Sequence, residues 1–196
     1  MAFQYAIVLT GSIATGKSSV AKILKKLGFE IIDADSIAHE ILNEQHEQVA
    51  QIFGNDLVQN RIVDRKALGG IVFTDNQKRK ILEELLHPLI YKRIEALSVI
   101  LDAKERPYLI DIPLFFETNR YPVEKSLVVY CSPKTQLKRL MQRDKRETWD
   151  AQQRIDTQIS IEKKVKYASY VIDNSGTLAA LEHECLRVKE EILGDF

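Results

Sequence analysis

The fold of this chain is decided by one short stretch, Gly11-Ser12-Ile13-Ala14-Thr15-Gly16-Lys17-Ser18. It matches the pattern G-x-x-x-x-G-K-[ST], in which a glycine-rich turn points successive backbone amides at phosphate oxygens. An apolar run at residues 4–10 comes before it, and a helical pattern of apolar side chains follows it. A helix that starts here directs its positive end at the same phosphates. The sequence therefore predicts that this phosphate loop binds a nucleoside triphosphate.

Each part of the loop has its own expected task. Lys17 reaches the outer phosphates, and the Ser18 hydroxyl can ligate Mg²⁺. The flanking strand and helix favour a nucleotide site over the alternative, a glycine-rich turn without a ligand. The expected ATP contacts in this region are Gly11, Ser12, Ile13, Ala14, Thr15, Gly16, Lys17, Ser18 and Ser19.

The composition sets limits on the rest of the chain. Its 196 residues suffice for one domain with an inserted subdomain. The 28 basic and 28 acidic residues balance, which argues against a general nucleic-acid binder. No apolar run approaches the roughly 20 residues of a membrane span, and the N-terminus lacks the pattern of a signal peptide. We expect a cytoplasmic monomer or weak homo-oligomer, with Cys131 and Cys185 as buried thiols.

Five short apolar segments predict strands, at residues 4–10, 29–32, 108–112, 127–131 and 170–173. Runs of this kind suit parallel strands that are buried on both faces. Helical patterns separate them, and Gly28 stands where a helix C-cap is expected. The predicted fold class is α/β, a three-layer P-loop NTPase-like fold with a five-stranded parallel sheet.

Residues 36–104 mostly lack strand signals and predict a helical insertion between the second and third strands. The nucleotide-binding core is then formed by residues 1–35 and 105–196. Because long connections are usually functional, we expect the insertion to bind the acceptor substrate. The alternative is a bulky crossover between two strands.

Local signals divide this insertion. Asp35 or Ser36 can cap its first helix, and Asp64 and Asp75 can cap later ones. The polar stretch 55–63 predicts an irregular bend, with at most a short extended piece. The pair His87-Pro88 is expected to end one helix, with Pro88 in the first turn of the next.

A basic segment follows the fourth strand. Residues 134–154 hold seven Lys or Arg and three acidic side chains. Such a run is usually a solvated helix face. Because this one lies at the same edge of the predicted sheet as the phosphate loop, we expect a lid at about residues 139–165 whose arginines face the phosphates.

The remaining signals favour a small-molecule kinase among phosphate-loop proteins. The chain is too short for a motor or helicase with two core domains. It lacks the N-K-x-D signature that reads guanine, and Asp111-Ile112-Pro113-Leu114 lacks the glycine of a D-x-x-G switch. A lid that excludes water protects the transferred phosphoryl group from hydrolysis.

Further motifs follow the loop in a fixed order: Asp33-Ala34-Asp35, Leu86-His87-Pro88, Ile112-Pro113-Leu114-Phe115-Phe116-Glu117, Gln136-Leu137-Lys138-Arg139, Gln142-Arg143-Asp144 and Val171-Ile172-Asp173-Asn174-Ser175-Gly176. With them the chain resembles the dephospho-coenzyme A kinase family along almost its whole length. The family commonly has Gly-Gly-Ile-Gly-Ser-Gly-Lys in the loop, where this chain has Ser12, Ala14 and Thr15. The backbone of Ala14 then either avoids the left-handed region or bears a small strain there.

The resemblance implies transfer of the γ-phosphate of ATP to the ribose 3′-hydroxyl of dephospho-CoA, the last step of coenzyme A synthesis. The cofactors implied are ATP as co-substrate and Mg²⁺. Two alternatives are a kinase for another nucleoside or nucleotide, and a phosphate-loop switch protein without an acceptor of its own.

The resemblance also implies a catalytic set, made of Asp35, Lys17, Arg143, Arg139 and Asp33. A carboxylate must orient the acceptor hydroxyl and take its proton. Asp35 is expected to do so, with Asp33 as the alternative or as an indirect Mg²⁺ ligand. Asp35 can equally be a helix N-cap, or serve both purposes. Arg139 and Arg143 are expected to meet the charge that develops during transfer.

The expected acceptor-binding residues are Asp33, His87, Pro113, Leu114 and Glu117. His87 has a structural alternative beside the helix break, and Glu117 has one as a member of a local ion pair. Asn174 and Gly176 resemble the adenine-side loop of the family, although a strand-to-helix turn explains them equally well. Trp149 either packs at the lid hinge or stacks on a ligand, and packing is favoured.

Overall fold

The computed structural model describes residues 2–118 and 120–196. The chain forms two compact units. The first unit comprises the residues up to Ile32 together with Ser98–Phe196, and the second comprises Asp33–Leu97. Each unit is described by itself below.

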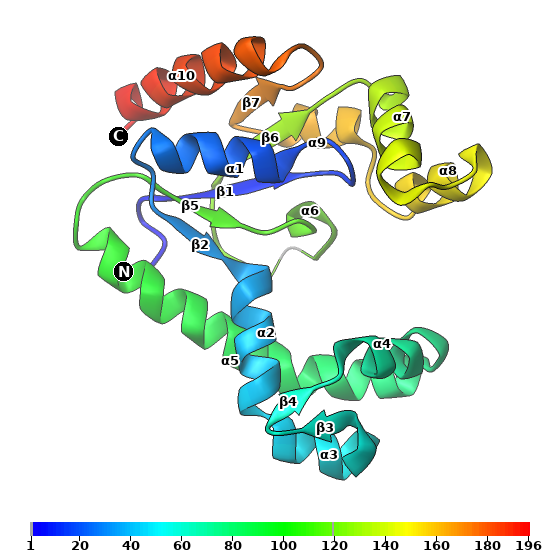
Figure 1. Ribbon diagram of the computed structural model, residues 1–196. Helices are drawn as coiled ribbons and strands as arrows, with labels where there is room; N and C mark the ends of the chain where they lie inside the picture. Colours follow the sequence, from blue (N-terminus) through cyan, green and yellow to red (C-terminus); the bar gives the residue numbers. More distant parts are fainter. Residues whose placement is uncertain (1, 119) are drawn as a thin grey trace. The chain divides into compact units, whose positions relative to one another are not determined.

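The first unit is built on a five-stranded sheet with the order β2-β5-β1-β6-β7 (Figure 1). Its strands are β1 (Ala6–Gly11), β2 (Ile31–Asp33), β5 (Tyr108–Asp111), β6 (Lys125–Tyr130) and β7 (Tyr170–Asp173). The pairs β1–β5, β1–β6 and β6–β7 are parallel. The predicted five-stranded parallel sheet is thus confirmed. The phosphate loop leaves the end of its central strand, β1.

Helices pack on this sheet because its strands are apolar on both faces. Ile7 and Leu9 of β1 share a buried cluster with Leu24 and with Val188. These partners lie on α1 (Lys17–Lys26) and α10 (Leu178–Gly194). Val8 points to the opposite face and is also fully buried. Gly28 has the positive φ expected of a residue that follows a helix end.

The remaining helices of the first unit are short. They are α6 (Phe115–Thr118), α7 (Pro133–Asp144), α8 (Thr148–Asp156) and α9 (Ile161–Tyr167). α7 and α8 lie side by side, and α9 returns to contact β6 (Figure 1). The basic segment 134–154 lies in α7 and α8, and the predicted lid, at about residues 139–165, extends from α7 into α9.

The second unit is mainly helical and has its own apolar core, which includes Leu42, Val49 and Leu68. Its elements are α2 (Ala34–Glu44), α3 (His46–Phe53), η1 (Asn55–Leu57), β3 (Val58–Gln59), β4 (Ile62–Val63), α4 (Arg65–Thr74) and the first part of α5 (Asn76–Asp102). Asp64 and Asp75 accept hydrogen bonds from the amides that follow them, as predicted for helix caps.

One expectation for the second unit was incomplete and another was wrong. The stretch 55–63 contains the short extended piece that was expected, but it is ordered as an antiparallel hairpin of β3 and β4, not as an irregular bend. Asn60 and Arg61 both have positive φ, which is the geometry of a type I′ turn. Pro88 lies inside the continuous helix α5 and does not break it. Packing of Leu82, Leu85 and Leu86 on the core of the unit offsets the missing backbone hydrogen bond.

Candidate functional site

The phosphate loop places its small residues in conformations that most side chains avoid. Gly16 has φ 92° and precedes the first residue of α1. A Cβ on Gly16 would collide with Asn174 Nδ2, and one on Gly11 would lie 2.7 Å from Thr15 Oγ1. Ala14 has φ 62°, so its backbone adopts the strained alternative, which costs about 1–2 kcal/mol.

Lys17 and Asp111 form an ion pair at the carboxyl end of the sheet. Asp111 ends β5, and its Cα is in register with that of Leu9 on the neighbouring strand β1. Both side chains are mostly buried, so water weakens their attraction little. In the sequence, Asp111 stands out only as the aspartate of a segment that lacks the glycine of a GTPase switch. Its place beside Lys17 depends on which strands are neighbours, which no local motif specifies.

The two candidate arginines of α7 lie in different surroundings. Arg139 Nη1 is buried without a hydrogen-bond partner among the described residues, 3.9 Å from the ideal Cβ position of Gly16. Arg143 is exposed and donates two hydrogen bonds to Asp144. These bonds lower the pKa of the Asp144 carboxyl. The structure therefore brings Arg139 to the phosphate loop and holds Arg143 on its sequence neighbour.

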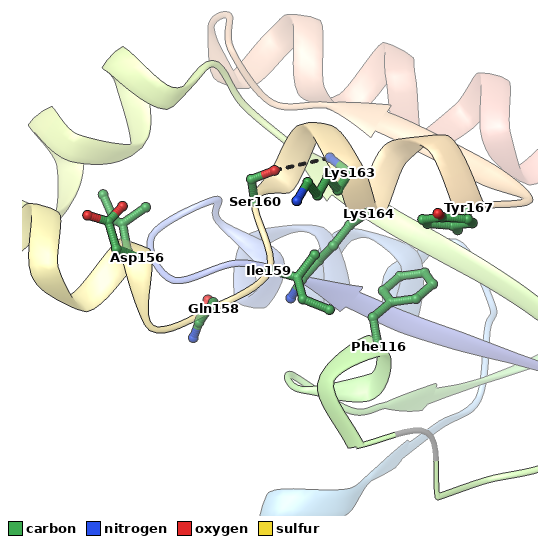
Figure 2. A pocket seen from close by; sticks show the side chains of 9 residues that line it. Phe116, Asp156, Gln158, Ile159, Ser160, Lys163, Lys164 and Tyr167 are labelled. Atoms are coloured by element: carbon green, nitrogen blue, oxygen red, sulfur yellow. Dashed lines mark hydrogen bonds between the residues drawn. The ribbon is translucent and has the colours of Figure 1, made fainter.

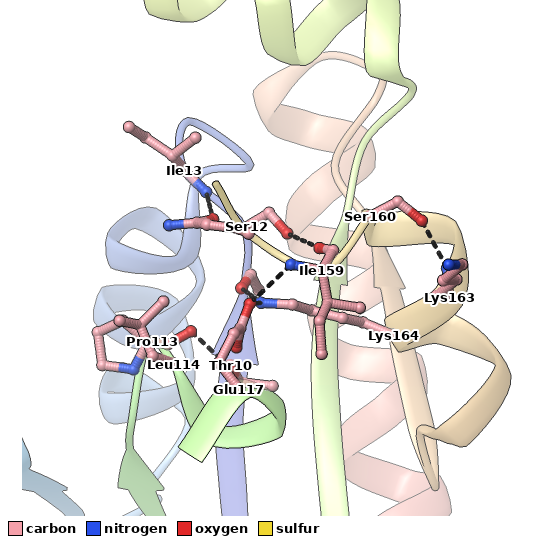
Figure 3. Close-up of polar contacts among 12 residues, drawn as sticks. Thr10, Ser12, Ile13, Pro113, Leu114, Glu117, Ile159, Ser160, Lys163 and Lys164 are labelled. Carbon is pink, nitrogen blue, oxygen red and sulfur yellow. Dashed lines mark hydrogen bonds and ion pairs between the residues drawn. The ribbon is translucent and has the colours of Figure 1, made fainter. Parts of the chain in front are cut away.

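Glu117 takes part in a local ion pair, one of its two predicted alternatives. Its Oε1 lies 2.8 Å from Lys164 Nζ and accepts a hydrogen bond from Ile159 N at 3.1 Å (Figure 3). Lys164 is completely buried. The pair joins α6, which follows β5, to α9 and to the segment that precedes it.

The segment between α8 and α9 touches the phosphate loop directly. Gln158 Oε1 accepts a hydrogen bond from Ile13 N at 2.8 Å, and Ser12 Oγ donates one to Ile159 O at 3.4 Å. Beside these contacts lies a cavity of about 570 Å³, lined from α6 by Phe116 and from α8, α9 and the segment between them (Figure 2). The predicted lid segment is thus attached to the loop through its own side chains.

Asp33 and Asp35 of the second unit differ from the prediction in which of them caps a helix. Asp33, not Asp35 or Ser36, is the N-cap of α2, and its carboxylate accepts a hydrogen bond from Ser36 N at 3.0 Å. Asp35 lies exposed in the first turn, and its carboxylate has no hydrogen bond to any residue that the structure describes. Its carboxylate is therefore available for another task.

The other predicted acceptor and adenine residues are distributed over several elements. His87 is half-buried within α5. The Pro113 carbonyl accepts a hydrogen bond from Thr10 Oγ1 at 3.0 Å, while the Leu114 side chain is 42% exposed. Asn174 is buried against the phosphate loop, and Gly176 is exposed in the turn after β7.

Trp149 does not pack at a hinge, because its side chain is 67% exposed on α8. The favoured packing alternative is therefore wrong. An indole in water retains the surface that stacking on a ligand would bury.

The comparisons with known proteins agree along the chain. The family model described as Dephospho-CoA kinase matches residues 5–180. This chain belongs to the dephospho-CoA kinase family. The dephospho-CoA kinase of Sulfurimonas denitrificans is 46% identical over 192 residues, which cover 98% of this chain and 96% of that protein. The Helicobacter pylori (strain ATCC 700392 / 26695) enzyme of the same name is 42% identical over 98% of this chain and 100% of its own.

Two solved structures are similar to this chain over almost its whole length. The dephospho-CoA kinase from Campylobacter jejuni superposes with a TM-score of 0.80 at 40% identity, covering 98% of this chain and 99% of that one. The structure of TT1252 from Thermus thermophilus gives 0.77 at 30% identity, covering 95% and 96%. The resemblance predicted from the motifs, and the P-loop kinase fold with it, are confirmed.

Two negative findings concern the described residues, 2–118 and 120–196. They include no helix that is long and apolar enough to cross a membrane. They also include no group of three or more His, Cys, Asp or Glu side chains that could hold a metal ion.

Proposed function

We propose that this chain transfers the γ-phosphate of ATP to the ribose 3′-hydroxyl of dephospho-CoA, which yields coenzyme A and ADP. One observation carries the proposal: a phosphate loop of the right geometry stands in a chain that matches the dephospho-CoA kinase family over residues 5–180. No observation favours another nucleoside kinase or a switch protein. The reaction uses small molecules, and we propose that it occurs in the cytoplasm, in a monomer or weak homo-oligomer, without nucleic acid or membrane.

The residues around the loop fit ATP. The glycine positions leave no room for side chains where the backbone must approach phosphates. The buried, unpartnered Arg139 Nη1 beside Gly16 is a donor that a nucleotide oxygen would satisfy. Lys17 would exchange part of its pairing with Asp111 for the β- and γ-phosphates. The loop amides, with Ser19 in the first turn of α1, complete the proposed ATP contacts.

Mg²⁺ also fits the residues present. The Ser18 hydroxyl is exposed in the first turn of α1, and Mg²⁺ prefers one or two hard oxygen ligands from the protein, with phosphates and water as the rest. When bound, the ion would supply neutralisation of the charge on the transferred phosphoryl group. We propose Ser18 as its protein ligand, with Asp33 as an indirect one.

We propose Asp35 as the base, with Asp33 as the alternative. The acceptor 3′-oxygen forms a bond to the γ-phosphorus while the bond to the β–γ bridging oxygen breaks. The hydroxyl proton passes to the Asp35 carboxylate, and ADP leaves with the electron pair of the broken bond. Asp35 is exposed and free of a capping bond, which suits this task better than the capping carboxylate of Asp33.

The remaining expected contacts are proposals of the same kind. Arg139, and Arg143 after it leaves Asp144, would stabilise charge during transfer. The segment 139–165 would serve as the lid and residues 36–104 as the acceptor-binding insertion. The proposed acceptor contacts are Asp33, His87, Pro113, Leu114 and Glu117, and the proposed adenine-side contacts are Asn174 and Gly176.

The direct test is an acceptor screen. Purified protein with ATP and Mg²⁺ is offered dephospho-CoA, adenosine, AMP and shikimate, and both ADP formation and the phosphorylated product are measured. We expect product with dephospho-CoA alone, and phosphate at the 3′ position. Phosphorylation of another acceptor while dephospho-CoA remains unchanged would refute the proposal.

A further inference from the structure

Three buried side chains from outside the phosphate loop donate hydrogen bonds to its carbonyl oxygens. They belong to α7, to α9 and to the turn after β7. The bonds run from Gln136 Nε2 to Ile13 O at 2.7 Å, from Lys164 Nζ to Gly11 O at 2.8 Å, and from Asn174 Nδ2 to Thr15 O at 2.8 Å. The carbonyls of every second loop residue are thus held from outside.

The burial of these donors is costly and needs a reason. Their side chains are exposed by 1% for Gln136, 0% for Lys164 and 7% for Asn174. A buried amide or ammonium without a partner is strongly unfavourable, and an apolar residue would fill the same space at no such cost. The Lys164 charge even requires a second buried partner, Glu117. The chain therefore buries three polar side chains at a cost in free energy, and each of them donates a hydrogen bond to a carbonyl of the loop.

Because a peptide unit is planar, a hydrogen bond to its carbonyl also fixes the direction of its N–H. No peptide bond among the described residues is cis. In a trans peptide the carbonyl and the following N–H point in opposite directions. Holding the carbonyls of Gly11, Ile13 and Thr15 outward therefore turns three amides the other way, those of Ser12, Ala14 and Gly16.

The peptide that joins Ser12 to Ile13 is held in the opposite orientation. Ser12 O accepts hydrogen bonds from Thr15 N at 3.2 Å and from Thr15 Oγ1 at 2.9 Å, within the loop. The N–H of the same peptide, on Ile13, points instead to Gln158. Residues outside the loop thus bind the carbonyl of the peptides that follow Gly11, Ile13 and Thr15. In the peptide between Ser12 and Ile13 they bind the N–H instead. This alternation concentrates amides on one side, as in a backbone anion nest.

We propose that Gln136, Asn174 and Lys164 are positioning residues that fix the loop amides for phosphate binding. Neither Gln136 nor Lys164 needs to touch the nucleotide for this. Gln136 has a further task, because its bond adjoins Ala14, whose left-handed backbone is strained. The proposal rests on the proposed function only in taking a nucleotide polyphosphate as the ligand, and it holds for any acceptor.

The test uses variants of the full chain that keep side-chain size and remove the donor: Gln136→Met, Asn174→Leu and Lys164→Met. Matched controls are Gln153→Met on α8 and Lys166→Met on α9, both exposed. Dissociation constants for ADP and for adenosine are measured by calorimetry and ligand-observed NMR. Thermal unfolding is recorded in parallel, and Lys164→Met/Glu117→Gln replaces Lys164→Met if the lone glutamate prevents folding.

Each positioning variant is expected to weaken ADP binding about tenfold, in line with the loss of a strong hydrogen bond. Gln136→Met and Lys164→Met are expected to leave adenosine binding within about twofold, whereas Asn174→Leu is judged by ADP binding alone because Asn174 is also a proposed adenine-side contact. A purely structural role would weaken both ligands together or neither. The proposal is overturned if folded Gln136→Met and Asn174→Leu bind ADP within about twofold of the wild type. Failure of the acceptor screen with intact ADP binding would instead refute the proposed function alone.

Discussion

At the scale of single residues, polar groups of the phosphate loop have ion-pair or hydrogen-bond partners within the protein. Lys17 is paired with Asp111, and Ile13 N is bonded to Gln158. The Lys17 ammonium is a group that a nucleotide also attracts, so binding exchanges a partner there, whereas the Ile13 amide is held away from the phosphate side. Exchange of this kind keeps polar groups satisfied in both states and limits the free energy lost on release.

The proposed base is tested by Asp35→Asn, which keeps the size of the side chain and removes its basicity. We expect turnover to fall by about 10²–10⁴-fold, the usual contribution of general base catalysis, with ATP affinity unchanged. Steady-state kinetics and ATP binding measure the two quantities. Asp33→Asn is the matched variant, because Asn caps a helix about as well as Asp. Near-normal turnover in Asp35→Asn would transfer the role to Asp33.

The buried thiol of Cys185 gives a pH prediction. Burial raises the pKa of this thiol to about 11 from its ordinary value of 9.0. Between these values the thiol of the unfolded chain loses its proton while that of the folded chain keeps it. The thiol therefore contributes stability that is fully present below pH 9 and is lost as pH rises to 11. The melting temperature should fall less steeply over this range in Cys185→Ala than in the wild type; equal slopes would contradict the assignment.

At the scale of elements, two departures from the sequence pattern have one cause, which is packing. α5 continues through Pro88, and a hairpin replaces the expected bend. In both places local preference is overridden by apolar contacts in the core of the second unit, to which Val63, Leu82 and Leu85 belong.

The hairpin allows a stabilising substitution, Arg61→Gly. Arg61 has φ 64°, where a Cβ is unfavourable, and Asn-Gly is the preferred pair for a type I′ turn. Part of the gain is offset by the greater freedom of glycine in the unfolded chain, so we expect about 0.5–1 kcal/mol in favour of the folded state. Urea unfolding measures it. Loss of stability in this variant would argue against the turn.

At the scale of the whole molecule, the proposed donor groups and the proposed base belong to different compact units. The phosphate loop, Arg139 and Lys164 are in the first unit, and Asp33 and Asp35 are in the second. The donor half of the site therefore rests on one continuous sheet and its helices. ATP binding should depend on that unit and on its loop.

ATP is accordingly expected to stabilise the folded chain. At about one hundred times its dissociation constant, a ligand adds about 2.7 kcal/mol, which for this length raises the melting temperature by roughly 5–11 °C. Lys17→Ala should abolish most of the shift, because its ammonium meets the outer phosphates. Differential scanning fluorimetry with ATP and Mg²⁺ tests both. A full shift in Lys17→Ala would contradict the phosphate-loop assignment.

The sequence by itself determined the fold class, the nucleotide loop and the family. Each rests on contiguous residues: the loop lies within eight positions, the strands are short apolar runs, and the family motifs are local. Such local patterns can be recognised without knowing which residues are close together in space.

Only the tertiary structure decided which side chains meet the loop. Asp111, Gln136 and Lys164 are separated from it by about a hundred residues or more, and they reach it because β5, α7 and α9 converge beside the end of β1. The capping carboxylate of α2 also needed the structure, but for a local reason: Asp33 and Asp35 have the same side chain, and only the backbone geometry at the start of α2 makes Asp33 the cap. For the three side chains that reach the loop, the reason is different. Long-range pairing and burial set these roles, and neither leaves a periodic or local pattern in the chain.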